Sequence, residues 1–173
     1  MIIPFLIILV AAGLISGDTD SHSASSAAGS TAAVTSPSDV GKTKPKIESS
    51  PGSDPSGLEE TDLVVGTGAE ATPGTEVTVH YVIVLNKNGK EIESSWDGKP
   101  FSFELGSGEV TDGWEQGIEG MREGGRRELI APSGLAYGKA GSKSVGPNED
   151  LLYVIDLLKV KPPASEPATQ PQS

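Results

Sequence analysis

The chain has 173 residues, a formal net charge of −11 and no cysteine, and 35% of its residues are apolar. The lack of cysteine excludes disulfides, cysteine-ligated zinc and a thiol nucleophile. The two histidines, His22 and His80, lie too far apart in the sequence to favour a multi-histidine metal site. The acidic balance argues against nucleic acid as a partner, because phosphate backbones attract clustered lysine and arginine.

Residues 1–17 contain an uncharged apolar run from Ile2 to Ile15, followed by the small residues Ser16 and Gly17. The run is shorter than the roughly 20 residues of a membrane-spanning helix. It is typical of the apolar part of a secretory signal peptide, although no lysine or arginine precedes it. An uncleaved anchor or a buried helix is the alternative. We therefore expect export to the periplasm, the cell envelope or the medium, with membrane contact only through this segment if it stays uncleaved.

Low-complexity sequence flanks the central part of the chain. Residues 18–57 are rich in Ser, Ala, Gly, Thr and Pro, and residues 162–173 are rich in proline. Such segments bury too little apolar surface to offset the entropy of ordering, so we predict a disordered linker and a disordered tail. All aromatic residues except Phe5 lie between positions 81 and 153, which places a single folded domain at 58–161.

Within this domain, strands are the main predicted elements. Residues 76–85 alternate between apolar and polar and then become continuously apolar, which is typical of a strand. Residues 86–89 predict a hairpin turn, since Asn and Gly tolerate positive φ. Alternation predicts a further strand at 99–105, and apolar runs predict two more at 126–131 and 151–160.

Helical signal is confined to about ten residues that begin at Thr111 or Asp112, either of which is a plausible N-cap, and end at Arg122 before Gly124 and Gly125. The predicted apolar stripe consists of Trp114, Ile118 and Met121, and the residues expected to face water are Glu115, Glu119 and Glu123. Several strands joined by hairpins, with one short helix, predict an α+β domain in which an antiparallel sheet folds over the helix.

Other residues receive ordinary structural interpretations. His80 points away from Tyr81 on the same strand, so a structural role is expected rather than that of a general base. Trp96 is expected to be a partly exposed loop residue. The acidic residues between 91 and 115 lack the spacing of a calcium loop, which favours a solvated acidic surface over a cation site.

Taken together, the ordered motifs of this domain resemble the FKBP-type peptidyl-prolyl cis-trans isomerases over residues 62–161. The matching segments are VHY at 79–81, GKEIESS at 89–95, KPFSFELG at 99–106, EVTDGWEQG at 109–117, GRR at 125–127, LAYG at 135–138 and IDLLKV at 155–160. The resemblance implies a five- or six-stranded antiparallel sheet wrapped around one short helix. It also implies a monomeric enzyme that needs no cofactor or metal and acts on Xaa-Pro bonds of polypeptides.

The resemblance places the active site between helix and sheet. Trp114 would form the floor of the pocket, the Thr111 backbone N–H would bind the substrate carbonyl, and the Tyr137 hydroxyl would donate from an overhanging loop. The walls would be Tyr81, Phe101, Val110 and Tyr153. Glu93 replaces the family's usual Asp, and Ile92 replaces its usual Phe. The hydrophobic pattern alone would assign these aromatic residues to the core, so their proposed roles in the pocket depend on the resemblance.

The implied chemistry is non-covalent. Twisting the prolyl amide localises the nitrogen lone pair and lowers the polarity of the amide, so a dry aromatic pocket favours the twisted state. Macrolide immunosuppressants of the tacrolimus or rapamycin type are the implied drug ligands. The loop at 139–147 is about one residue shorter than in compact members of the family and lacks most of their aliphatic residues. The alternative function is a non-catalytic chaperone or scaffold module that binds prolyl segments.

Overall fold

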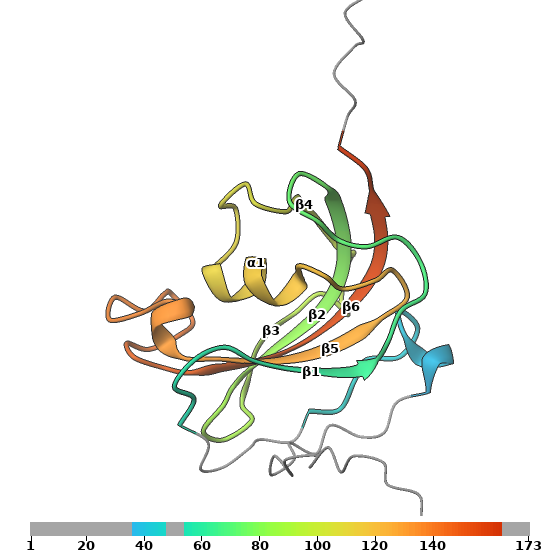
Figure 1. The fold of residues 1–173 in the computed structure, drawn as a ribbon. Helices are drawn as coiled ribbons and strands as arrows, with labels where there is room; N and C mark the ends of the chain where they lie inside the picture. Colours follow the sequence, from blue (N-terminus) through green and yellow to red (C-terminus); the bar gives the residue numbers. More distant parts are fainter. Residues whose placement is uncertain (1–35, 48–53, 164–173) are drawn as a thin grey trace, which may run out of the picture.

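The computed structural model describes residues 36–47 and 54–163, within which six strands form one antiparallel sheet (Figure 1). The strand order is β1-β5-β6-β2-β3, and β4 pairs with β2. The strands are β1 (Glu59–Val64), β2 (Glu76–Leu85), β3 (Glu91–Ser94), β4 (Phe101–Glu104), β5 (Arg126–Ala131) and β6 (Leu151–Lys161). One α-helix, α1 (Asp112–Ile118), lies against the concave face of the curved sheet (Figure 1). The predicted α+β class, a sheet wrapped around one short helix, is confirmed.

The two central strands, β2 and β6, pair from Glu76 opposite Lys161 to Leu85 opposite Leu151. Because successive side chains of a strand point to opposite faces, Ile83 joins the core cluster under α1, whereas Val82 and Val84 join a second cluster on the far face. Burial on both faces explains why the second half of β2 is apolar without alternation.

Residues 36–47, which we call the strap, lie against the far face of the sheet. Ile47 packs on the second apolar cluster, and the Gly41 N–H donates a 2.6 Å hydrogen bond to Asp156. The Arg126 guanidinium donates to the main-chain oxygen of Thr43 at 3.0 Å. This differs from the disordered linker expected over all of 18–57. The difference arises because the strap's backbone groups hydrogen-bond to charged side chains of the sheet, which composition does not reveal.

The remaining boundary predictions fall largely outside the described residues. The predicted signal peptide or anchor at 1–17, the linker up to residue 35 and the tail from residue 164 stay predictions. Among the helices within 36–47 and 54–163, none has the length and apolar character required to cross a membrane.

Helix α1 ends earlier than predicted. The sequence predicted a helix reaching Arg122, but Glu119 already has an extended backbone, with φ −55° and ψ 133°. The next residue, Gly120, has φ +78°, a conformation that glycine adopts at little cost and that ends a helix. The sequence prediction used Gly124 and Gly125 as the signal for the end of the helix, and the helix instead ends before Gly120.

Two side chains assigned to that helix therefore lie beyond it. Met121 is buried, as the predicted stripe required, but it lies in the turn after α1. Glu123 was expected to face water, and instead its carboxylate accepts a 2.9 Å hydrogen bond from the Val160 N–H. The carboxylate thus joins the turn after α1 to the end of β6.

The predicted strands match β2 and β5 residue for residue and β6 to within one residue, whereas β4 is shorter than the predicted 99–105. Two strands were not predicted. β1 and β3 are largely exposed, and they lie at the two ends of the strand order. An edge strand with mostly solvated side chains lacks the hydrophobic alternation that predicts a strand.

Candidate functional site

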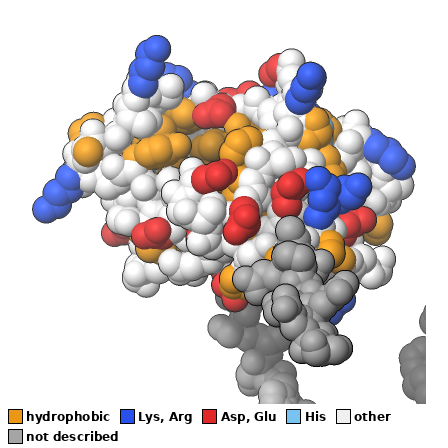
Figure 2. Space-filling model, turned by 90° about the horizontal axis from the view of Figure 1, so that it is seen from above, with side chains coloured by type: hydrophobic (Ala, Val, Ile, Leu, Met, Phe, Trp, Pro, Cys, Tyr) orange, Lys and Arg blue, Asp and Glu red, His pale blue; other side chains and the backbone are white. Residues whose placement is uncertain are grey.

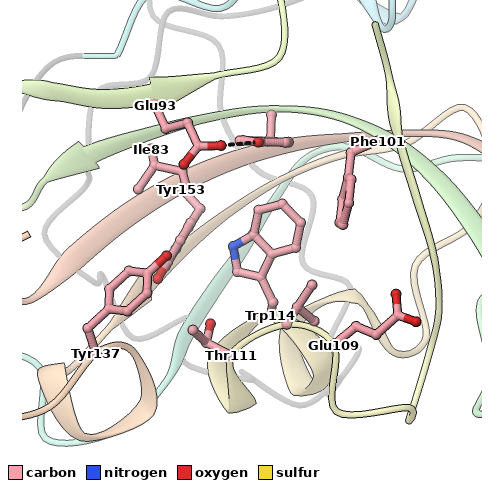
Figure 3. Close-up of a pocket in the computed structure, with 10 residues that line it drawn as sticks. Ile83, Glu93, Phe101, Glu109, Thr111, Trp114, Tyr137 and Tyr153 are labelled. Carbon is pink, nitrogen blue, oxygen red and sulfur yellow. Dashed lines mark hydrogen bonds between the residues drawn. The ribbon is translucent and has the colours of Figure 1, made fainter. Parts of the chain in front are cut away.

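A cavity of about 330 Å³ lies between α1, the sheet and the segment that follows β5 (Figure 3). Its lining residues are Tyr81, Ile83, Glu93, Phe101, Glu109, Val110, Thr111, Trp114, Tyr137 and Tyr153. The structure thus brings together all eight residues that were predicted as catalytic positions, and their roles in catalysis stay predictions. Seen from above, hydrophobic side chains surround a hollow on the molecule, with acidic side chains beside it (Figure 2).

Trp114 is the buried aromatic residue around which the other rings of the pocket gather. Its ring meets Tyr81 edge to face at 5.0 Å, Tyr153 at 5.9 Å and Phe101 at 6.4 Å between centroids. Aromatic pairs favour such edge-to-face arrangements. The indole is therefore held in one orientation, between Phe101 on one side and the tyrosines Tyr137 and Tyr153 on the other (Figure 3).

Helix α1 can bring Trp114 this close to the sheet because Gly117 faces β5. A Cβ at position 117 would lie 2.4 Å from the Leu129 Cδ1, well inside van der Waals contact. The absence of a side chain lets the helix backbone approach the strand directly. The glycine thus sets the depth of the cavity floor.

Tyr81 and Glu93 form the polar contact at the sheet side of the pocket. The Tyr81 hydroxyl donates to the Glu93 Oε1 at 2.5 Å, and the Tyr81 backbone N–H donates to the Ser95 Oγ at 2.9 Å. Burial, and then the hydrogen bond to Glu93 and its charge, raise the pKa of Tyr81 well above its usual value. The phenol therefore stays neutral and fixed in position at physiological pH.

Replacing Glu93 with glutamine is expected to lower the pKa of Tyr81, because the charge and the carboxylate acceptor both disappear. The pKa should stay above the usual value of about 10, since burial is the larger cause and remains. A tyrosine Cζ NMR titration measures the shift. The matched control is Glu109→Gln, which removes the other lining carboxylate and should leave the pKa of Tyr81 unchanged. An unaltered Tyr81 titration in E93Q would contradict this account.

The opposite side of the pocket carries three hydroxyl groups, those of Thr111, Tyr137 and Tyr153 (Figure 3). Tyr153 comes from β6 and is 1% exposed, and Thr111 precedes α1. The segment bearing Tyr137 is held by the Ser133 N–H, which donates to Asp150 at 2.7 Å. Burial raises the pKa values of both tyrosines, and Glu93 adds to the rise at Tyr137. Both tyrosines therefore keep their hydroxyl protons at physiological pH.

Charged groups are few at the cavity. Glu93 and Glu109 line it, and no lysine, arginine or histidine from residues 36–47 or 54–163 does. Across the described ranges, no cluster of three or more His, Cys, Asp or Glu residues is arranged to hold a metal ion.

His80 does not line the pocket. Its ring stacks on Trp96 at 4.4 Å between centroids, and its Nδ1 hydrogen-bonds the Ser95 Oγ at 2.9 Å. Burial lowers the pKa of His80, with Asp156 acting in the opposite direction. These contacts fit the structural role expected for His80 and the partly exposed position expected for Trp96.

The sequence interpretation missed two lining residues, Ile83 and Glu109. Ile83 follows Tyr81 by two positions on β2, so strand alternation places both on the same face and could have identified it. Glu109 was grouped with the solvated acidic surface. Its position directly before Val110 was the available signal, but it lies in an irregular segment whose direction periodicity does not predict.

Comparison with known proteins gives consistent matches. A family model described as FKBP-type peptidyl-prolyl cis-trans isomerase matches residues 68–158. An "FK506-binding protein" of Streptomyces anulatus is 45% identical over 120 residues, which span 68% of this chain and 97% of the relative. A "Probable FK506-binding protein" of Corynebacterium glutamicum is 46% identical over 116 residues, covering 66% of this chain and 97% of the relative.

Solved structures match as well. The crystal structure of AtFKBP13 aligns with a TM-score of 0.57 and 41% identity, covering 62% of this chain and 95% of that one. FkpA from Escherichia coli aligns with a TM-score of 0.57 and 36% identity, covering 62% of this chain and 49% of that one.

Proposed function

The chain belongs to the family of FKBP-type peptidyl-prolyl cis-trans isomerases, and from this membership we propose that it accelerates rotation about Xaa-Pro bonds in polypeptides that bind over Trp114. The observation that carries the proposal is the aromatic pocket, in which the rings of Tyr81, Phe101 and Tyr153 meet the Trp114 indole edge to face.

The proposed mechanism needs no covalent step. The peptide C–N bond has partial double-bond character, and its rotation faces a barrier of about 20 kcal/mol. In the twisted state the nitrogen lone pair no longer conjugates with the carbonyl, so the amide becomes less polar. An apolar cavity stabilises that state relative to the planar one, and only this difference accelerates the reaction. The Thr111 backbone N–H and the Tyr137 hydroxyl are proposed to donate hydrogen bonds to the substrate carbonyls on either side of the proline.

An isomerisation assay on short prolyl peptides tests the proposal. We expect kcat/KM above about 10⁴ M⁻¹s⁻¹, the lower range of enzymes. Tyr137→Phe should lower it about three- to tenfold, the value of one hydrogen bond. Thr78→Val is the matched control, since that hydroxyl pairs with Ser102 away from the pocket, and it should leave the rate unchanged. Binding of prolyl peptides without acceleration would contradict catalysis and favour the non-catalytic module.

Macrolide binding is proposed for the same pocket. Both bacterial relatives carry FK506 in their names, and the tyrosines and Trp114 offer a large apolar surface with hydroxyl donors beside it. Competitive inhibition by FK506 in the same assay supports this, and undiminished turnover at saturating drug contradicts it.

Export is proposed on sequence grounds, from the apolar run at residues 2–15 and the small residues after it. N-terminal sequencing of protein recovered from medium and envelope fractions decides between a cleaved leader and an anchor. Recovery of the intact chain from the cytoplasm alone would contradict export.

A further inference from the structure

Two carboxylates line the cavity, and the proposed isomerase mechanism gives no role to the second of them. The Glu93 carboxylate accepts the Tyr81 hydroxyl at 2.5 Å. Glu109 is exposed, and no side chain within residues 36–47 or 54–163 forms an ion pair or a hydrogen bond with its carboxylate. Its negative charge is therefore available to a ligand that enters the cavity.

The two carboxylates lie on opposite sides of the Trp114 indole (Figure 3). If roughly spherical, a cavity of about 330 Å³ is about 9 Å across, which is similar to the Debye length of about 8–10 Å at physiological ionic strength. A polypeptide bound over Trp114 therefore brings the residues beside its proline into the field of both charges, in whichever direction the chain runs.

The negative charge acts across the cavity and has no opposite charge to offset it there. Besides its hydrogen-bond partner Tyr81, Glu93 raises the pKa of Tyr137, with burial as the larger cause at both residues. In the described part of the chain, no lysine, arginine or histidine lines the cavity. A cleft with charge of one sign attracts ligands of the opposite sign and repels those of the same sign.

An exposed aromatic ring favours lysine and arginine as the source of the positive charge. Phe101 is 38% exposed, and it lies on the same side of the Trp114 indole as Glu109 (Figure 3). Lysine and arginine have an apolar stem that packs on apolar surface while the charged end reaches a polar group. Their cationic groups are also attracted to the face of an aromatic ring.

We propose that Glu109 is a specificity residue, which selects polypeptide segments that carry a lysine or an arginine directly beside the proline. This inference rests on the proposed isomerase function and deepens it by naming the substrate class, basic prolyl segments. Glu93 adds to the attraction, but its carboxylate also holds Tyr81. Substitution of Glu109 therefore tests charge selection without removing that hydrogen bond.

The test uses four peptides with blocked termini, in which lysine or glutamate stands either directly before or directly after the proline. In at least one of the two positions, the wild-type protein is expected to give a kcat/KM about five- to twentyfold higher for lysine than for glutamate. An exposed ion pair and a relieved repulsion each contribute up to about fivefold. The assay is run at about 10 mM salt and repeated at about 1 M, where a Debye length of about 3 Å should bring the ratio close to one.

Glu109→Gln should lower the ratio of lysine to glutamate peptide, and Glu109→Lys should lower it further. The matched control is Glu59→Gln, which removes the same charge from an exposed position on β1, a strand that supplies no residue to the cavity. E59Q should keep the wild-type ratio. Dissociation constants of the same peptides, measured by calorimetry, provide a readout that does not depend on turnover.

The outcomes separate charge selection from isomerase activity. Tighter binding of the lysine peptides without acceleration of any peptide would contradict catalysis and support charge selection. Acceleration of all four peptides with no preference at either position would overturn charge selection and leave the isomerase function intact. A preference that is the same in E109Q, that E59Q reduces equally, or that persists at 1 M salt would overturn the role of the Glu109 charge.

Discussion

Replacing Asp156 with asparagine is expected to lower the free energy of unfolding by about 3–5 kcal/mol, because it leaves the buried Arg126 guanidinium without its counter-charge. Both side chains are 1% exposed, and Arg126 binds the carboxylate through two hydrogen bonds of 2.5 and 2.7 Å. The same carboxylate accepts the Gly41 N–H of the strap. One substitution therefore weakens the ion pair and an attachment point of the strap together.

Urea denaturation measures the loss, and hydrogen exchange at the Gly41 amide reports whether the strap has opened. The control is Glu70→Gln, which breaks an ion pair to Arg122 whose two side chains are about half exposed. Exposed pairs contribute at most about 1 kcal/mol, so E70Q should be nearly neutral. Equal stability of D156N and E70Q would contradict the account.

A double variant separates the charge from the packing. Arg126→Met combined with Asp156→Leu removes both charges and fills the buried space with apolar side chains. This variant should recover much of the stability that D156N loses. Hydrogen exchange at Gly41 should still be faster than in the wild-type protein, because leucine does not accept its N–H. If the double variant is no more stable than D156N, the ion pair itself stabilises the fold, and its role is not limited to cancelling two buried charges.

The second large effect is expected at the pocket floor. Trp114→Ala should lower kcat/KM by about a hundredfold or more, because it removes the ring that Tyr81, Phe101 and Tyr153 contact. It should also lower the free energy of unfolding by about 3–5 kcal/mol, as large-to-small core substitutions do. Trp114→Phe keeps a ring and should fold stably with about tenfold lower activity. The prolyl-peptide assay and urea denaturation measure the two losses separately.

The other tryptophan offers a matched control. Trp96 stacks on His80 outside the cavity, so Trp96→Phe should change kcat/KM less than about twofold. Wild-type activity in W114F together with a large loss in W96F would contradict the placement of the site.

The sequence predicted the central strands well, for a physical reason. β2 and β6 bury long apolar runs and β5 buries a short one at residues 129–131, and buried apolar residues are what produce a hydrophobic pattern in the sequence. β1 and β3 were missed because their side chains are largely exposed, and their strand conformation depends on pairing with a neighbour. The strap was missed because it is polar and contains glycine, and because the backbone groups of Gly41 and Thr43, which bind Asp156 and Arg126, leave no signal in the sequence pattern.

The membership of the candidate site was predicted through motif resemblance rather than through pattern. Tyr81, Trp114 and Tyr153 are all apolar-face residues of regular elements, so periodicity alone assigns them to the core.

The strap has a consequence for how this domain can be handled and displayed. It binds the face of the sheet opposite α1, whereas the cavity lies on the α1 side. A fluorophore, a bead or a fusion partner attached at residue 36 is therefore expected to lie on the face of the sheet opposite the cavity. Immobilisation through residue 36 should therefore leave the mouth of the cavity accessible.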